Sequence, residues 1–226
     1  MTYEGNLTKT GLRTPKAAAL AGILFALLLL IAFGLLRASV PTESLAPGLW
    51  LPANARTIGL ALNLIPFSGV AFLWFIGVLR DRLGQHEDRL LSTVFLGSGL
   101  LFLAMLFAAA AVVGSIIIAF TARPEQAIDP DMFVFVRTLA FNLMNVYAIK
   151  MAAVFMFSTS TVALYTQFVP RYVAFLGHGL ALVLLLGSHY WDWSFFVFPL
   201  WVLLLSIQML IDNFRSPRGS AMEQLP

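Results

Sequence analysis

The sequence predicts an all-α fold, a polytopic transmembrane helix bundle of six spans with both termini cytoplasmic. The first observation is composition: 60% of the 226 residues are hydrophobic and 11% are charged, with a mean hydropathy of +0.87, whereas soluble domains carry about 25% charged residues. The second is a series of apolar runs long enough, or nearly so, to cross a hydrocarbon core of about 30 Å. The third is the distribution of lysine and arginine between those runs.

The apolar runs divide the chain into three parts. We expect a cytoplasmic N-terminal segment at residues 1–16 and a cytoplasmic tail at residues 212–226. The transmembrane domain between them, residues 17–211, is expected to hold helices at about residues 17–36, 57–79, 91–120, 132–167, 172–187 and 195–211. A cleaved signal peptide is the alternative for the first run. That run exceeds the usual hydrophobic region of ~7–15 residues, which favours a retained span.

The segment before the second helix, residues 37–56, contains three prolines and Trp50. Tryptophan prefers the headgroup level, so we expect this linker to lie along the membrane interface. Within the second helix, Pro66 removes a backbone donor and is expected to kink the helix near Leu62. The carbonyls freed there need a neighbour or water, and Asn63 is the nearby polar candidate. A kink with no further role is the favoured interpretation.

The third run, residues 91–120, would be about 45 Å long as a helix, so it must tilt or project from a bilayer. Its small residues predict a seam where another helix approaches closely; they are Gly97, Gly99, Ala108 to Ala111, Gly114 and Ser115. The charged stretch before it, residues 80–89, contains His86 beside two acidic residues. We interpret that stretch as a solvated loop and not as a metal site.

The fourth run, residues 132–167, carries Arg137, Asn142, Asn145 and Lys150 among apolar residues. Ionisable residues within a bilayer are rare and usually face a bundle interior or a cavity, so Lys150 is the principal candidate for a functional site. At 100° per residue, Asn142 and Asn145 share one face, and Lys150 lies on another face with Tyr147. Arg137 is close enough to the helix start to snorkel to the non-cytoplasmic interface.

The charge of Lys150 needs a partner that the spans do not supply, because no Asp or Glu occurs within any predicted span. Three arrangements are possible. The amine is neutral because burial disfavours its charged form, or it contacts Asn63, a carbonyl freed by Pro66 or the ring of Tyr147, or it meets an external anion. A structural role and a ligand contact both stay open. A retinal-type Schiff base is disfavoured by the missing carboxylate and by six spans instead of seven.

His178 lies in the fifth run, between Gly177 and Gly179, and we expect it to hydrogen-bond a neighbouring helix. His189 would lie about 16 Å further along, so the two histidines cannot clasp one haem; contact of His178 with a haem or pigment is the weaker alternative. The hydroxyls of residues 158–161 are expected to bond to helix carbonyls. The absence of cysteine excludes thiolate metal sites. No metal or cofactor site is evident, and bound lipid is expected.

The basic residues orient the chain. The side that holds both termini carries nine lysines and arginines, and the other side carries three. By the positive-inside rule both termini are cytoplasmic. The net charge of +3 points to anionic lipid headgroups and not to nucleic acid, because no basic stripe is interleaved with stacking aromatics.

Several stretches carry a resemblance: YAIKMAAVFMFSTSTVALYTQFVPRYVAFLGHGLALVLL, with FIGVLRDRLG and VFLGSGLLFLAMLFAAAA before it and VFPLWVLL after it. Over about residues 60–210 the chain resembles uncharacterised small bacterial polytopic integral membrane proteins. The resemblance implies a multi-pass protein of the bacterial plasma (inner) membrane. It implies no activity, because none is assigned to that group.

These observations predict a membrane protein that is not an enzyme, since no acid–base pair or catalytic motif emerges. The leading hypothesis is an accessory or structural subunit of a larger membrane complex, or a self-associating scaffold, whose partners are membrane lipids and other subunits or itself. The alternative is a small transporter or channel for an anion or polar solute, with Lys150, Asn142 and Asn145 lining the path.

Overall fold

The computed structural model describes residues 14–41, 50–83, 89–122, 129–167, 169–187 and 193–215. Every regular element in these ranges is a helix, which confirms the all-α prediction. The elements are α1 (Thr14–Ser39), α2 (Trp50–Leu83), α3 (Arg89–Ala122), α4 (Pro130–Asn142), the π-helix η1 (Leu143–Ala148), α5 (Ile149–Thr166), α6 (Arg171–Gly187) and α7 (Ser194–Arg215). Because α4, η1 and α5 are continuous, they form one rod, called here the α4–α5 rod.

Five helical rods in this part of the chain are long and apolar enough to cross a membrane. The sixth, α6, is apolar but only 17 residues long. α2 and α3 are each 34 residues long, or about 50 Å, and the α4–α5 rod is longer still. Length and composition are therefore those of a multi-pass membrane protein.

α2 is longer at both ends than the helix predicted at residues 57–79. It begins at Trp50, so residues 50–56 of the predicted linker are helical; the interfacial location of this segment stays a prediction. Pro52 sits in the first turn, where the backbone N–H has no intrahelical partner and a proline costs little. At its other end α2 runs on to Leu83, into the stretch predicted as a loop. Residues 84–88, with His86, lie outside the described ranges, as do most of the predicted terminal segments.

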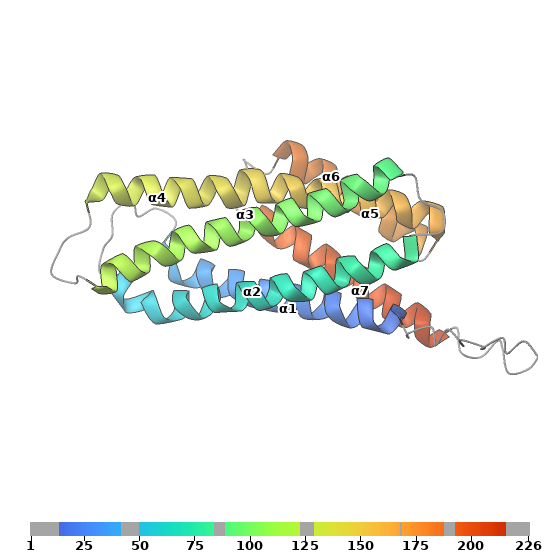
Figure 1. Ribbon diagram of the computed structural model, residues 1–226, viewed down its shortest axis with the longest axis horizontal. Coiled ribbons are helices and arrows are strands. Elements are labelled where there is room, and N and C mark those ends of the chain that lie inside the picture. The colour runs from blue at the N-terminus through green and yellow to red at the C-terminus, as the bar shows by residue number, and fades with distance from the viewer. Residues whose placement is uncertain are drawn as a thin grey trace, which may run out of the picture.

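The rods run roughly along one long axis (Figure 1). α1 packs on α2 and α7, α3 packs on α2 and on the α4–α5 rod, and α6 packs on α5. The first described turn of α1 and the last of α7 lie at the same end of the bundle (Figure 1). This matches an even number of passes.

α7 begins partway along the bundle, level with the end of α1. The Phe195 ring lies 5.2 Å from the Phe33 ring, and the Trp193 ring lies 5.4 Å from the Arg37 guanidinium. Beyond this level α2, α3 and α4 continue (Figure 1) around a separate small core of Leu51, Ile58 and Phe133. The bundle therefore has fewer helices at this end than further along its length.

Five phenylalanines from five helices fill the centre of the bundle. They are Phe25 of α1, Phe72 of α2, Phe102 of α3, Phe155 of α5 and Phe198 of α7, and each is at most 2% exposed. Their ring centroids lie 4.5 to 6.4 Å apart, mostly in edge or tilted arrangements, the geometry that aromatic pairs prefer. The middle of the bundle is a packed apolar core.

The predicted small-residue seam of α3 is confirmed at Gly99 and not at Gly97. Gly99 packs against α2 and α5, and a Cβ there would lie 2.7 Å from the Ile76 side chain and 3.1 Å from the Phe155 ring. Gly97 has no such neighbour. Close helix approach on this part of α3 therefore depends on one glycine.

Candidate functional site

The π-helical segment η1 interrupts the α4–α5 rod near its middle, at Leu143–Ala148. In a π-helix the hydrogen bonds run over one residue more than in an α-helix, and such segments are frequent at functional sites. The N–H of Ile149 bonds to the carbonyl of Met144, five residues earlier. Asn142, Asn145 and Lys150 all lie in this segment or within two residues of it.

The extra residue in the π-helical segment rotates all later side chains of the rod about the helix axis. In an uninterrupted α-helix Lys150 would lie about 80° around the axis from Asn142, and one inserted residue reduces this angle to about 20°. Asn142 and Lys150 are both exposed in the structure, whereas Asn145 is half-buried and faces a cavity. The prediction that Asn142 and Asn145 share one face and Lys150 lies on another is therefore wrong, because it assumed a regular α-helix.

Lys150 lies on the outer surface of the bundle. Along the rod it is about 20 Å from Arg137 and about 24 Å from the last turn at Thr166. In the part of the chain that the structure describes, Lys150 makes no hydrogen bond or ion pair, so the expected contacts with Asn63 or with carbonyls near Pro66 are not formed. Both of those residues are exposed on α2. Tyr147, the other expected neighbour, is 57% exposed.

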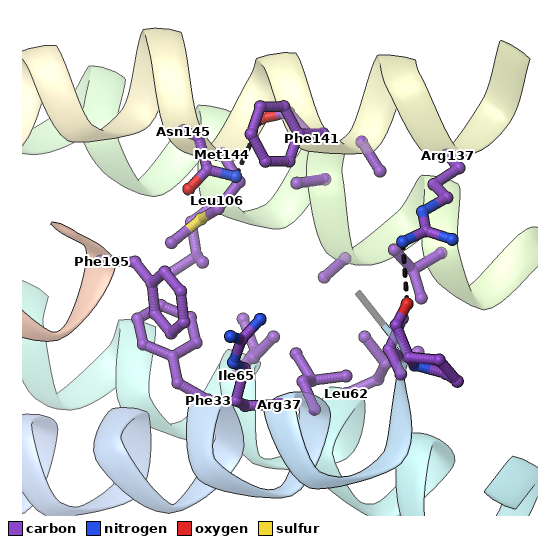
Figure 2. A pocket seen from close by; sticks show the side chains of 17 residues that line it. Phe33, Arg37, Leu62, Ile65, Leu106, Arg137, Phe141, Met144, Asn145 and Phe195 are labelled. Carbon is purple, nitrogen blue, oxygen red and sulfur yellow. Dashed lines mark hydrogen bonds between the residues drawn. The ribbon is translucent and has the colours of Figure 1, made fainter. Parts of the chain in front are cut away.

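A cavity of about 300 Å³ lies on the inner side of the rod. α1 and α2 form one wall, α4 and η1 form the opposite wall, α3 lies behind, and Phe195 of α7 closes one end (Figure 2). Of the 17 residues that line it, three are polar: Arg37, Arg137 and Asn145. The lining described by the structure contains no carboxylate.

The polar residues of the cavity are held by contacts across the bundle. Nη2 of Arg137 donates to the carbonyl of Pro41 at 2.9 Å, which ties α4 to the end of α1 (Figure 2). Arg137 lies near the start of the rod, and its snorkelling to the interface stays a prediction. The Arg37 guanidinium points into the cavity from α1 (Figure 2). Asn145 Nδ2 donates to the carbonyl of Phe141 at 3.3 Å.

The role of Arg37 was missed by the sequence analysis, which assigned it to a linker. α1 continues to Ser39, so Arg37 stands in its last turn. Arg37 and Arg137 are brought to one cavity by the packing of helices far apart in the chain. No local sequence pattern predicts that these two arginines line one cavity. The sequence shows only a basic residue at the end of a helix, where the helix dipole favours a positive charge.

The prediction for His178 is confirmed. Its Nε2 lies 3.1 Å from Thr161 Oγ1 of α5, and its Nδ1 lies 2.9 Å from the carbonyl of Ala174. The ring also meets Phe157 edge-on, with centroids 4.6 Å apart. Both ring nitrogens thus have partners within the bundle.

The hydroxyls of α5 mostly behave as predicted. Ser158, Thr159 and Thr161 donate to the carbonyls four residues earlier, at 2.8 to 2.9 Å. Ser160 is the exception: its Oγ is buried and has no hydrogen-bond partner among the described residues. Nε1 of Trp201 is also buried without a hydrogen-bond partner among the described residues. Both atoms lie against Gly177 of α6. No group of three or more potential metal-ligating side chains occurs in the described ranges.

Comparison of the chain with protein-family models, with curated proteins and with solved structures finds no match. The class of the protein therefore follows from the fold alone. It is an all-α bundle whose long apolar helices have the length and composition of membrane spans.

Proposed function

We propose that the protein is a non-catalytic accessory subunit of a larger complex in the bacterial plasma membrane. It spans the membrane six times, with α6 as the shortest span and both termini in the cytoplasm. Five rods of spanning length and one shorter apolar helix support the number of spans. The excess of basic residues on the side of the termini supports the orientation, and the bacterial location rests on the resemblance described above.

The observation that carries this proposal is the exposure of Lys150 in the middle of the α4–α5 rod. On insertion scales a lysine at the bilayer centre costs about 2.5–3.5 kcal/mol, and such residues usually face protein or water. Here the ammonium stands on the outer surface of the chain's own bundle, and Asn142, about 12 Å away along the rod, is also exposed. A polar face at this depth fits a contact with another membrane protein.

The positive charge of Lys150 indicates which chemical group the partner would present. An intramembrane carboxylate on a transmembrane helix would balance Lys150, with Asn142 available to hydrogen-bond across the contact. A second copy of this chain offers asparagine and lysine there, whereas Asp131 and Asp212, the acidic residues of its candidate spans, lie at the ends of those spans and not near the middle. The proposed partner is therefore a different protein, and the self-associating scaffold is the weaker alternative.

The transporter alternative has less support from this arrangement. It requires Lys150, Asn142 and Asn145 to line one path. The π-helical segment separates them, with two on the outer surface and Asn145 at the cavity. The phenylalanine core also fills the centre of the bundle.

Extraction from native membranes in mild detergent tests the proposal, with Lys150→Met compared with the wild type. The matched control is Arg171→Met, which removes an exposed positive charge at the start of α6. We expect the wild type and the control to co-purify with a partner at fixed stoichiometry, and Lys150→Met to retain less than a tenth of it. Replacing the partner's carboxylate with leucine should restore binding to Lys150→Met.

Two results would overturn the proposal. One is a wild-type chain that migrates only as a monomer or homo-oligomer. The other is an equal yield of partner with Lys150→Met, since the contact would then not depend on the lysine.

A further inference from the structure

We propose that two copies of the chain pair in the membrane through the outer face of α2. At the centre of the contact, the Asn63 side chain of each copy donates a hydrogen bond to the Leu62 carbonyl of the other. The proposal rests on the membrane insertion of α2 proposed above. It uses a different helix from Lys150, so the pair forms with or without the partner proposed there.

Asn63 is a polar side chain near the middle of a candidate membrane span. The span covers Leu51–Arg80, and Asn63 lies about 18 Å along the helix from its first residue and about 26 Å from its last. The side chain is exposed and makes no hydrogen bond with the described residues. In hydrocarbon such an amide has no water to bond to, and asparagines at this depth form hydrogen bonds between helices.

The backbone carbonyl of Leu62 is a second polar group at the same depth. In a regular α-helix it would accept a hydrogen bond from the N–H of residue 66, but Pro66 has no N–H. Pro66 is exposed, so the missing hydrogen bond opens on the outer side of α2. No side chain in the described part of the chain donates to this carbonyl. Proline is tolerated in a span where a neighbouring helix supplies the missing donor, which points to a helix outside this bundle.

These two groups are complementary to a second copy of themselves. Two copies inserted with the same topology and related by a two-fold axis along the membrane normal place α2 beside α2, in parallel and at equal depth. The Asn63 amide of one copy then meets the Leu62 carbonyl of the other, and the reverse contact forms with it. One symmetric interface therefore satisfies both polar groups on both chains.

The face around Asn63 has the spacing of a helix pair. Exposed residues follow one another at intervals of three and four, namely Leu60, Asn63, Phe67, Val70 and Trp74. These are the intervals of a heptad seam, along which two helices pack at about 20°. α2 packs on α1 and α3 through its other faces, so no helix of the described bundle covers this one.

Crosslinking in native membranes tests the pairing, because the chain has no cysteine of its own. Phe67→Cys and Val70→Cys each place one thiol on the proposed seam, and the control Leu176→Cys places one on the exposed face of α6. With a short bifunctional maleimide, we expect both seam variants to give a product of twice the chain's mass. The control should give no more of it than random collision does.

The dissociation constant of the pair locates the contact at Asn63. It is measured on the purified chain in bilayers, by energy transfer between copies labelled at the C-terminus. Asn63→Leu should raise the constant about tenfold, since it removes both reciprocal hydrogen bonds. Asn63→Gln keeps the amide and should stay within about threefold of the wild type. The matched control, Asn142→Leu, removes an exposed asparagine from another helix and should pair like the wild type.

Pro66→Ala tests the role of the carbonyl separately. It restores an N–H that bonds to Leu62 within the helix, so the carbonyl no longer depends on the second copy. We expect the dissociation constant to rise about threefold.

A wild-type chain that stays monomeric in bilayers, or an Asn63→Leu variant that pairs as tightly as the wild type, would overturn the proposal. Equal crosslinking from the α6 face would also overturn it, as would seam crosslinks only to a protein of another mass. Neither experiment depends on Lys150. Their failure would leave the accessory-subunit proposal standing, and a failure of the Lys150 test would leave the pairing standing.

Discussion

Nε2 of His178 lies 3.1 Å from Oγ1 of Thr161, and this contact joins α6 to α5. Nδ1 of the same ring faces the carbonyl of Ala174 at 2.9 Å, so Nδ1 carries a proton and donates it. In the neutral imidazole Nε2 then accepts from the Thr161 hydroxyl. That hydroxyl also faces the carbonyl of Phe157 at 2.9 Å, and its one proton is shared between the two acceptors.

This contact predicts a measurable coupling between the two side chains. His178→Leu and Thr161→Val should each lower the free energy of unfolding by about 0.5–1.5 kcal/mol. The double variant should lose less than the sum of the two, with a coupling of about 0.6 kcal/mol, as for interhelical hydrogen bonds in other membrane proteins. Reversible unfolding in mixed micelles measures all four proteins. A coupling of zero would mean that the contact adds nothing to stability.

Gly177 and Gly179 form a matched pair on α6. A Cβ at Gly177 would overlap Ser160 Oγ and lie 2.7 Å from Trp201 Nε1, whereas a Cβ at Gly179 would meet nothing within 4 Å. Gly177→Ala should therefore destabilise the protein by about 1–3 kcal/mol, the usual cost of overpacking. Gly179→Ala should be neutral or stabilise it by up to about 1 kcal/mol. Thermal unfolding of the two variants side by side decides this, and equal effects would contradict the close packing of α6.

Ser160→Ala removes a buried hydroxyl that has no partner among the described residues. Because a buried polar group without a hydrogen bond costs about 1–3 kcal/mol, we expect this substitution to leave stability unchanged or to raise it. Thr159→Ser is the control, since it keeps a hydroxyl that donates to the carbonyl of Phe155. A loss above about 1 kcal/mol in Ser160→Ala would show that the hydroxyl is engaged, for instance by a water shared with Trp201 Nε1.

Lys150→Met should stabilise the isolated chain in lipid bicelles. The ammonium is exposed in the middle of the rod and has no hydrogen bond or ion pair with the described residues, so its removal lifts a desolvation cost of up to about 2.5–3.5 kcal/mol. Arg171→Met, at a helix end, should change stability by less than about 0.5 kcal/mol. Unfolding of both variants in the absence of any partner gives the comparison. A destabilised Lys150→Met would mean that the lysine already has a partner within the chain.

The helices themselves were predictable because each depends on a local property. A run of about 20 apolar residues requires a helix in a membrane, whatever surrounds it, and the expected spans at residues 17–36, 91–120 and 172–187 all lie within α1, α3 and α6. The start of α2 was not predictable in this way. Residues 50–56 are mixed in polarity and contain Pro52, and their helix packs through Leu51 and Ile58 against Phe133 of α4, a contact between distant segments.

The candidate site was predictable only in part, because its geometry, unlike its residue types, depends on more than local composition. The residues were visible, since Lys150 and Asn145 are polar groups in an apolar run. Their relative orientation depended on η1, and the sequence LMNVYA has no composition that distinguishes a π-helix from an α-helix. The cavity depended on Arg37 and Arg137, which only the assembled bundle brings together.

The unequal lengths of the rods have a consequence for the surrounding lipid. α6, with 17 residues, spans about 25 Å, less than the average hydrocarbon thickness of about 30 Å, while α2 and α3 are about 50 Å long. In the proposed six-span topology, lipids beside α6 would thin to cover its exposed apolar side chains, such as Phe175 and Leu186, whereas α2 and α3 would tilt or rise above the surface. Hydrophobic mismatch costs a fraction of a kcal/mol per ångström. In that topology the protein would deform the bilayer unevenly around its circumference, and thin membranes would favour the side that presents α6.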